Sequence, residues 1–283
     1  MTDFVDTNAL AYSGRALPAL RQAELVSRWG WWFQAERRLL GMKAYWTTIA
    51  GEAVLTPLLY LIAMGVGLGR LVDAGSGGVG GVSYLAFVGP GLLVASTVMT
   101  ATGEFTYGVM DGFKWSKIYF ARSATAASPW QVAVGELLAV GVRFLAQSLV
   151  FWLMLVAFGV AGWGSWPIAL VASLAALAFG APLMAFSAAQ TDEGTQFTMI
   201  QRFVVAPMFL FAGTFFPLES MPVYLQWIGW ISPMWHGTQV ARLLAFGLPV
   251  PPWLVAVHLA FLVVLVGLGT FLTVRNFERR LQR

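Results

Sequence analysis

Long apolar runs separated by short polar segments dominate the hydrophobic pattern of this chain. A helix needs roughly 20 mostly apolar residues to cross a bilayer, and five runs are long enough. They cover residues 46–68, 85–107, 131–160, 166–189 and 253–274, and a sixth, shorter run covers residues 201–216. The pattern predicts an all-α polytopic membrane protein with six transmembrane helices.

Composition supports lipid as the main solvent of the folded chain. Only 11% of the 283 residues are charged and 58% are hydrophobic, whereas soluble domains are about 25% charged. The chain has no cysteine and two histidines, which excludes disulfides, thiol chemistry and a histidine-based metal site.

The distribution of positive charge predicts the orientation. Lysine and arginine collect in cytosolic loops, and thirteen of the 17 share one side if six helices span and both termini are cytosolic. These thirteen are Arg15, Arg21, Arg28, Arg37, Arg38, Lys43, Lys114, Lys117, Arg122, Arg275, Arg279, Arg280 and Arg283. The opening residues lack the apolar segment of a secretory signal. The excess of arginine over lysine suggests a high-GC bacterium, and the localisation we expect is the bacterial cytoplasmic membrane.

The apolar residues of the segment 21–43 recur with the period of an amphipathic helix and do not form a continuous apolar run. Seven apolar residues fall within an arc of about 140° at 100° per residue. They are Leu25, Val26, Trp29, Trp32, Phe33, Leu39 and Leu40, and the opposite side carries Ser27, Gln34, Arg37 and Arg38. Glu36 is an exception, because it points into the apolar arc. We expect an amphipathic helix lying on the membrane surface, within a cytosolic arm of residues 1–45; a soluble helix packed on a partner is the alternative.

Motifs for independent catalysis are absent. The sequence has no GxxxxGK[ST] phosphate loop, no HExxH and no GxSxG, so we expect no catalytic residue, no ATP hydrolysis by this chain and no bound cofactor. Nothing indicates nucleic-acid binding. A glycine-rich membrane domain without catalytic motifs is typical of a transport pathway whose energy is supplied by another component.

Apart from Arg202 at the start of the run 201–216, four charges lie within the predicted spans: Glu52, Glu104, Glu136 and Arg143. Their positions place all four near the cytosolic leaflet, so a proton relay through the membrane centre is disfavoured. One interpretation is structural salt bridges and headgroup contacts. The other is a polar entry zone for the head of an amphiphile, formed by Glu52, Glu104 and Arg143.

The first cytosolic loop, residues 108–131, mixes aromatic side chains with cations at helical spacing. The residues involved are Met110, Phe113, Lys114, Lys117, Tyr119 and Phe120, with Trp115 between them. Exposed aromatics at this density are typical of a contact surface, although a solvated loop obeying the positive-inside rule is the alternative.

Two segments resemble the membrane subunits of type 2 ABC exporters, in particular the nodulation lipo-oligosaccharide exporter and daunorubicin-resistance permeases. The first is "FLFAGTFFPLESMPVYLQWIGWISPMWHGTQVARLLAFG", residues 209–247, similar to the family's FFP-like turn, L-P-x-x-L-Q and P-x-x-H-x-x-x-x-x-R elements. Met221 stands where leucine is usual. The second is "ARSATAASPWQVAVGELL", residues 121–138, where serine precedes Pro129. The resemblance covers about residues 25–280.

The resemblance implies a coupling helix that docks on a separate ATP-hydrolysing subunit, which would hold ATP and magnesium. By position it is residues 109–120, with Val109, Met110, Phe113, Lys114, Lys117, Tyr119 and Phe120 at the contact. Alanine at Phe113 and Tyr119 would then uncouple transport and leave folding intact. Two permeases, identical or homologous, and two ATPases would form the exporter within membrane lipid.

It also implies a re-entrant helical hairpin over residues 217–242, between the fifth and sixth spans. Prolines remove backbone donors and break helices, and broken backbone at membrane depth needs cover from protein or water. The gate would comprise Gly213, Phe216, Pro217, Pro222, Gln226, Pro233, His236 and Arg242. Glu219, His236 and Arg242 would lie near water, with Trp227, Trp230 and Trp235 as headgroup anchors; an exposed external loop is the alternative.

The function expected from these features is ATP-driven export of an amphiphile by the permease domain, residues 46–283. A glycolipid, a lipid-linked oligosaccharide and a hydrophobic drug remain open as substrates. The alternative is a stand-alone channel or proton-coupled secondary transporter, for which the sequence shows neither midplane charges nor inverted repeats. An intramembrane enzyme would need paired acids or a nucleophile and base, which are not apparent.

Overall fold

A computed structural model describes residues 19–192 and 194–282 of the chain. Within these ranges the chain is helical, and the only β feature is an isolated bridge between Val79 and Val82. Residues 1–18 of the predicted amino-terminal arm, and Arg283, lie outside the described residues. Five helices are long and apolar enough to cross a membrane, and a further apolar helix at Gln196–Phe211 is shorter.

Each apolar run of the sequence forms a helix. The longest helices are α2 (Ala19–Met42), α3 (Trp46–Leu61), α5 (Tyr84–Phe105), α8 (Pro129–Ala157), α9 (Pro167–Ala189) and α14 (Pro252–Leu281). The shorter ones are α4 (Arg70–Ser76), α6 (Tyr107–Met110), α7 (Ile118–Ser123), α10 (Gln196–Ile200), α11 (Ala206–Phe211), α12 (Val223–Trp230) and α13 (Pro233–Phe246). Two π-helical segments join neighbouring helices without a break, Ile62–Gly69 and Gln201–Val205, and a third, Asp111–Trp115, extends α6 up to a turn.

The boundaries differ from the expected ones chiefly in the second half of the chain. The fifth run is helical over Gln196–Phe211, so it begins and ends five residues earlier than the expected 201–216. It ends before Gly213, whose φ of 74° lies in the left-handed region that favours glycine. The last helix continues to Leu281 because its final turns pack on the protein's own core at Phe277.

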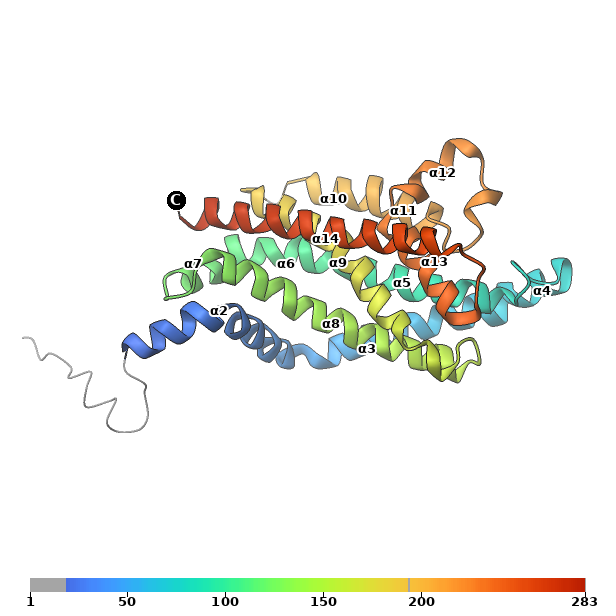
Figure 1. Cartoon of the computed structure of the whole chain (residues 1–283), viewed down its shortest axis with the longest axis horizontal. Helices are drawn as coiled ribbons and strands as arrows, with labels where there is room; N and C mark the ends of the chain where they lie inside the picture. Colours follow the sequence, from blue (N-terminus) through green and yellow to red (C-terminus); the bar gives the residue numbers. More distant parts are fainter. Residues whose placement is uncertain (1–18, 193, 283) are drawn as a thin grey trace, which may run out of the picture.

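The long helices run between two ends of an elongated bundle (Figure 1). α7 and the carboxy terminus lie at one end, together with the link from α9 to α10. α4, the link from α8 to α9, and α12 lie at the other end. The segment with α12 and α13 therefore leaves and rejoins the bundle at the same end, where α11 finishes and α14 begins.

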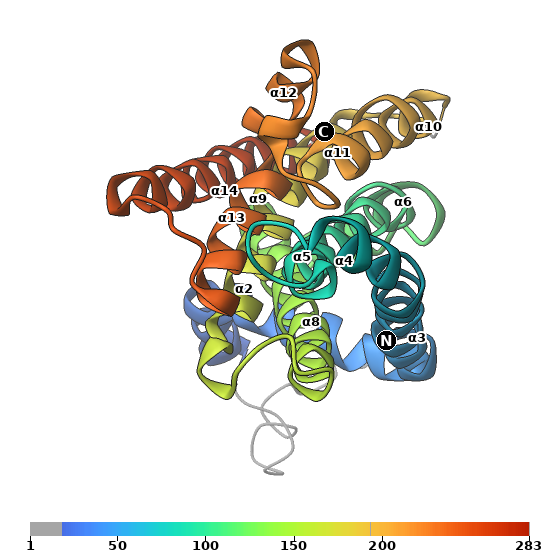
Figure 2. The same ribbon diagram turned by 90° about the vertical axis from the view of Figure 1, so that its right-hand side faces the viewer.

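α5 and α9 form the buried centre of the bundle, and α3 and α14 lie at its outside (Figure 2). In the most apolar window of α9, 72% of the residues are buried, compared with 17% in α14. An apolar helix with so little cover from its own chain needs lipid or another subunit against its outer face.

α2 packs along α8 rather than contacting only a membrane surface. Gly135 of α8 makes the close approach possible, because a Cβ there would lie 2.5 Å from Gln34 Cβ and 2.8 Å from the carbonyl oxygen of Trp31. Gln34 is buried in this contact and Arg38 turns into the protein. Two of the four side chains that the helical wheel placed opposite the apolar arc therefore pack inside the protein. Trp29, Trp32 and Leu40 of the predicted apolar arc are exposed in the isolated chain.

α9 and α14 also meet where one of them lacks a side chain. A Cβ at Gly269 would lie 2.5 Å from both Cδ and N of Pro182 and 2.7 Å from the carbonyl carbon of Ala181. One turn further along α14, the Thr273 hydroxyl donates a hydrogen bond of 3.0 Å to the carbonyl oxygen of Ala181. The crossing therefore has no room for a methyl group.

Replacing Gly269 with alanine is expected to separate these helices and to destabilise the fold by about 1–3 kcal/mol, the usual cost of overpacking. Gly267→Ala is the matched control, because a Cβ at Gly267 meets nothing within 4 Å. Thermal unfolding of both variants in the same detergent measures the difference. Equal unfolding temperatures would contradict the close approach.

Candidate functional site

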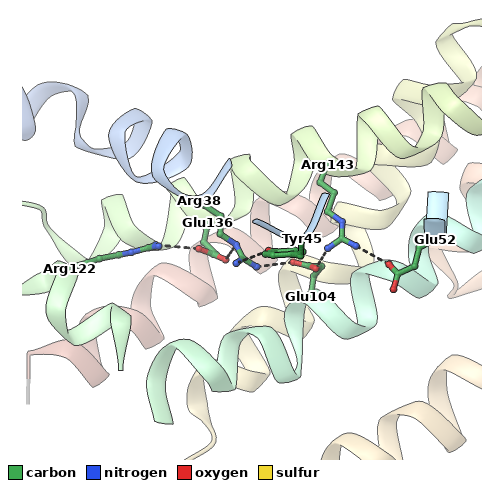
Figure 3. Close-up of polar contacts among 7 residues, drawn as sticks. All are labelled: Arg38, Tyr45, Glu52, Glu104, Arg122, Glu136 and Arg143. Carbon is green, nitrogen blue, oxygen red and sulfur yellow. Dashed lines mark hydrogen bonds and ion pairs between the residues drawn. The ribbon is translucent and has the colours of Figure 1, made fainter. Parts of the chain in front are cut away.

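A continuous series of ion pairs crosses the bundle and forms its most unusual polar feature (Figure 3). Its six members alternate in charge along the series. In spatial order this charge ladder consists of Arg122, Glu136, Arg38, Glu104, Arg143 and Glu52. The residues come from α7, α8, α2, α5 and α3, so the ladder ties five helices together.

The first half of the ladder centres on Glu136. Its Oε2 is 3.4 Å from Arg122 Nη1, and its Oε1 is 2.8 Å from Arg38 Nε. Arg38 then reaches α5, with Nη2 lying 3.0 Å from Glu104 Oε2. Arg38 Nη1 also donates a hydrogen bond of 3.3 Å to the Tyr45 hydroxyl. Each carboxylate oxygen of Glu136 therefore faces a different guanidinium.

The second half centres on Arg143, which bridges two carboxylates. Its Nη1 pairs with Glu104 Oε1, and its Nη2 lies 3.1 Å from Glu52 Oε2. The Arg143 side chain is 8% exposed and that of Glu104 is 13% exposed, whereas the Glu52 side chain is 57% exposed. The ladder thus runs from the protein interior to an exposed acid at its last position.

Burial makes complete pairing important. Removing charges from water costs several kcal/mol per ion, and good geometry with matched partners is needed to offset that cost. Three arginines and three glutamates give the ladder no net charge, and only Glu52 is largely exposed. Such an arrangement can fix the relative positions of helices, although it contributes less to net stability than the number of pairs suggests.

Local sequence explains how α2 and α8 reach this register. Ser128 and Gln131 form a capping box at the start of α8, with Pro129 at its first position. The Gln131 side chain also donates hydrogen bonds of 3.0 and 2.9 Å to the carbonyl oxygens of Val26 and Ser27 in α2. One glutamine therefore begins α8 and holds α2 beside it, which brings Arg38 to Glu136.

A cavity of about 550 Å³ lies at the Glu52 end of the ladder, between α3, α5, α8 and α11. Its wall combines the charged residues Glu52, Glu104 and Arg143 with several hydroxyl groups and apolar side chains. The lining consists of these three with Tyr45, Thr48, Ile49, Thr56, Pro57, Tyr60, Leu92, Ser96, Met99, Thr100, Gly103, Gln147 and Phe209. Small-molecule sites commonly have volumes of roughly 300–1,000 Å³ with a few polar groups in an apolar wall.

The sequence identified four members of the ladder, and the structure brings them together. Glu52, Glu104 and Arg143 meet at the cavity, and Glu136 lies further along the same series. The ion pairs match the salt-bridge interpretation, while the cavity leaves the entry-zone interpretation open. Sequence reasoning missed Arg38 and Arg122 as members of the ladder. The acids within the spans outnumber the cations there, and this excess could have indicated that cations from outside the spans pair with them.

The predicted coupling helix is divided and largely buried. α5 continues through α6 and the π segment to Trp115, the chain turns at Lys117 with a φ of 52°, and α7 begins at Ile118. Four of its expected contact residues are buried, so they cannot form an exposed surface in this conformation. These residues are Val109, Met110, Phe113 and Tyr119.

Phe113 and Tyr119 belong to an aromatic cluster with the last helix. The Phe113 ring centroid lies 4.8 Å from that of Tyr119 and 4.8 Å from that of Phe277. The Arg280 guanidinium sits 4.1 Å from the centroid of Phe113. Because both rings are part of the core, we now expect alanine at Phe113 and Tyr119 to destabilise the fold as well.

The exposed part of this segment is the turn around Ser116. Trp115 is 51% exposed and Phe120 is 40% exposed. Lys117 is exposed between them, and Lys114 forms a 3.0 Å ion pair with Asp192 at the end of α9. The hydrogen bond from Lys114 lowers the pKa of Asp192 below its usual value. Two aromatic side chains and a cation thus remain available to another protein.

Arg242 of the predicted gate is buried instead of lying near water. It is 1% exposed, and its Nη2 donates to the carbonyl oxygens of Gly213 and Thr214 at 2.8 and 3.0 Å. Its Nε donates to the carbonyl oxygen of Phe87 at 3.0 Å, and the guanidinium lies 3.6 Å from the centroid of that ring. Arg242 therefore joins α13 to α5 and to the turn after α11.

His236 is likewise buried, in contact with the other histidine of the chain. Its Nδ1 lies 2.7 Å from His258 Nδ1, and its Nε2 lies 3.0 Å from the carbonyl oxygen of Trp230. A carbonyl oxygen only accepts, so His236 Nε2 carries the proton and His236 Nδ1 accepts from His258 Nδ1. The pair holds α13 against α14, and the ring of Phe261 stacks on His236 with centroids 4.0 Å apart.

The other gate residues shape the turns around α12. Pro222 precedes α12, the Gln226 side chain donates a 3.0 Å hydrogen bond to the carbonyl oxygen of Met221, and Pro233 begins α13. The Ser232 hydroxyl caps α13 by accepting from Met234 N at 3.1 Å. The remaining members stand in the linker before α12: Gly213, Phe216 and Pro217, with Glu219 exposed beside them. Trp227 and Trp230 are exposed, and Trp235 is only half-buried.

Comparison with known proteins places this geometry in context. The family model described as ABC-2 type transporter matches residues 31–246. Nodulation protein J of Rhizobium leguminosarum bv. trifolii is 28% identical over 255 residues, which cover 89% of this chain and 94% of that protein. Nodulation protein J of Rhizobium meliloti (strain 1021) is 28% identical over 258 residues, with the same coverage. The corresponding protein of Bradyrhizobium diazoefficiens is 26% identical over 246 residues, covering 84% and 90%.

Proposed function

Because this chain belongs to the ABC-2 type transporter family, whose members are membrane transport components and not themselves catalytic, we propose that it exports an amphiphile with energy from a separate ATPase. The observation that carries this proposal is the 550 Å³ cavity at the end of the charge ladder. The substrate's polar head would occupy the wall formed by Glu52, Glu104 and Arg143, and its apolar part would lie against the bundle. A glycolipid, a lipid-linked oligosaccharide and a hydrophobic drug all have this character.

The membrane arrangement that we propose has six crossings, with α10 and α11 as the fifth. Both termini are cytosolic in the bacterial inner membrane, as the positive charges predict. The region from residue 217 to 246 enters the outer leaflet and returns on the same side. This is supported by the position of α12 and α13 at the end of the bundle where α11 finishes and α14 begins. α2 lies along the inner surface with Trp29 and Trp32 toward lipid.

The assembly that we propose contains two permeases and two ATPases. Support for a second permease comes from the large apolar surfaces that one chain leaves uncovered, for example Leu55 and Leu59 on α3 and Phe203 before α11. Support for the ATPase contact comes from Trp115 and Phe120 at the cytosolic turn. ATP and magnesium would be held by the ATPase, and the charge ladder would connect α7 beside this turn with the cavity.

Reconstitution tests this function directly. The chain would be purified with the ATPase that accompanies it and placed in liposomes, with a fluorescent alkyl glucoside as the transported probe. We expect movement of the probe only when both subunits and hydrolysable ATP are present. Movement by this chain alone would contradict the proposal and favour a channel or secondary transporter.

Exchanging Trp115 and Phe120 for alanine is expected to weaken the ATPase contact about tenfold or more, because buried aromatic anchors dominate interface energy. The fold should be unaffected, since both side chains are exposed. Binding of the purified ATPase to the variant in nanodiscs measures the effect. Trp163→Ala is the matched control, because that side chain is 71% exposed at the other end of the bundle. Unchanged ATPase affinity in the double variant would place the contact elsewhere.

A further inference from the structure

The charged groups of the cavity are unevenly available to a ligand. Arg143 is the only cation among its lining residues, and both of its terminal nitrogens already face carboxylates, those of Glu104 and Glu52. Its remaining nitrogen, Nε, is buried. The cavity therefore presents no guanidinium edge that could form the paired hydrogen bonds by which arginine binds phosphate.

Glu52 is the charge that a ligand would meet. One carboxylate oxygen, Oε2, pairs with Arg143, and Oε1 makes no hydrogen bond to any residue that the structure describes. The side chain is 57% exposed. Glu104 is paired on both sides, with Arg143 and with Arg38, so the unpaired oxygen of Glu52 is the negative charge that faces the cavity.

The rest of the polar wall consists of hydroxyl and amide groups. Gln147 Nε2 donates a 3.0 Å hydrogen bond to Thr100 Oγ1, which in turn donates to the carbonyl oxygen of Ser96 at 3.1 Å. Thr48 and Thr56 add hydroxyls on the α3 side. Hydroxyls can both donate and accept hydrogen bonds, so they suit a head group that also carries hydroxyls.

We propose that Glu52 sets the charge selectivity of this cavity, so that it accepts amphiphiles with an uncharged, hydroxyl-bearing head and rejects those with an anionic head such as a phosphate. This inference rests on the proposed export function and narrows its substrate class. An anionic head placed beside Glu52 would be repelled, and the paired Arg143 would not compensate. Lipids with a diphosphate next to the bilayer are therefore disfavoured as substrates.

The absence of cysteine from the chain allows a specific test. A single cysteine at exposed Thr56, which lines the cavity, would be labelled with N-ethylmaleimide in nanodiscs of phosphatidylcholine. Decyl glucoside and decyl phosphate share a tail and differ in the charge of the head. We expect decyl glucoside to slow labelling and decyl phosphate to have little effect. Labelling of Ser220→Cys, outside the cavity, should respond to neither.

Glu52→Gln is expected to strengthen protection by decyl phosphate about fivefold relative to protection by decyl glucoside, the effect of removing one like charge about 4 Å away in water. Glu219→Gln is the matched control, since it removes an exposed carboxylate outside this cavity. Equal protection by both compounds in the native sequence, or no change in Glu52→Gln, would overturn the charge selectivity while leaving an amphiphile site. Protection by neither compound would overturn both this inference and the cavity's place in the proposed function.

Discussion

Replacing Arg143 with alanine is expected to destabilise the protein by about 1–3 kcal/mol, the usual cost of removing a hydrogen-bonding partner from a buried group. Glu104 would keep only Arg38, and the exposed Glu52 would lose its partner. Unfolding by titration with a denaturing detergent, followed by tryptophan fluorescence, measures the loss. Arg37→Ala is the matched control, because Arg37 is exposed on α2 one residue before a ladder member.

A second variant tests whether the charge, and not the volume, causes this effect. Combining Arg143→Met with Glu104→Gln removes both charges of the shortest contact, and replacing a buried pair by neutral groups is often tolerated. We expect the double variant to be more stable than Arg143→Met alone, so that the two changes are not additive. Loss of less than about 0.5 kcal/mol in Arg143→Ala, the range of an ordinary surface change, would contradict the structural importance of the ladder.

Replacing Arg242 with alanine is expected to cost more than about 3 kcal/mol, because three backbone carbonyls would lose a partner and each unsatisfied buried group costs about 1–3 kcal/mol. The carbonyls belong to Phe87, Gly213 and Thr214. The same detergent titration measures stability. Faster proteolysis between α11 and α12 would show that the Gly213 turn has been released.

Two further variants make the Arg242 result specific. Arg242→Lys should fall between alanine and the native residue, because lysine lacks the planar fork that serves separate carbonyls. Arg70→Ala, at an exposed position on α4, should change neither stability nor proteolysis. Native stability of Arg242→Ala would mean that water replaces the guanidinium and that the clamp is dispensable.

Hydrophobic runs predicted the long helices well, because a chain that must satisfy its backbone within lipid has few options other than helix. The fifth run was displaced because its start depends on tertiary contacts. The Phe197 ring packs at 5.4 Å from the ring of Tyr107, so the helix extends back to Gln196 beyond the apolar run. The sequence window contains no information about that contact.

Members of the candidate site could be predicted where the position of a residue along its span gave its depth in the membrane. Members that join the site only through tertiary contacts could not be predicted. Position along the spans was enough to group Glu52, Glu104 and Arg143. Arg38 was placed only on the polar side of its helix, because a helical wheel of α2 contains no information about α8, and its partner Glu104 lies 66 residues away.

Aromatic and buried cationic positions were the main errors. From the sequence of the loop alone, Phe113 and Tyr119 look like residues of an exposed contact surface. In the structure both rings pack against Phe277, which lies far along the chain. Glu219 is the one acid within the motif, so placing Arg242 near water together with it was the natural expectation. Three carbonyl oxygens and an aromatic face take the place of an acid partner, and carbonyl partners leave no residue-type signal.

The link between α2 and α3 bends at Tyr45, whose φ of −127° and ψ of 29° depart from helical values. Its hydroxyl accepts a hydrogen bond from the same Arg38 guanidinium that pairs with Glu104 and Glu136. One side chain, that of Arg38, therefore contacts both the bend between α2 and α3 and the acids of the ladder. A rotation of α2 about this bend requires Arg38 to change partners. The ion pairs of Arg38 therefore restrict the movement of α2 relative to α3.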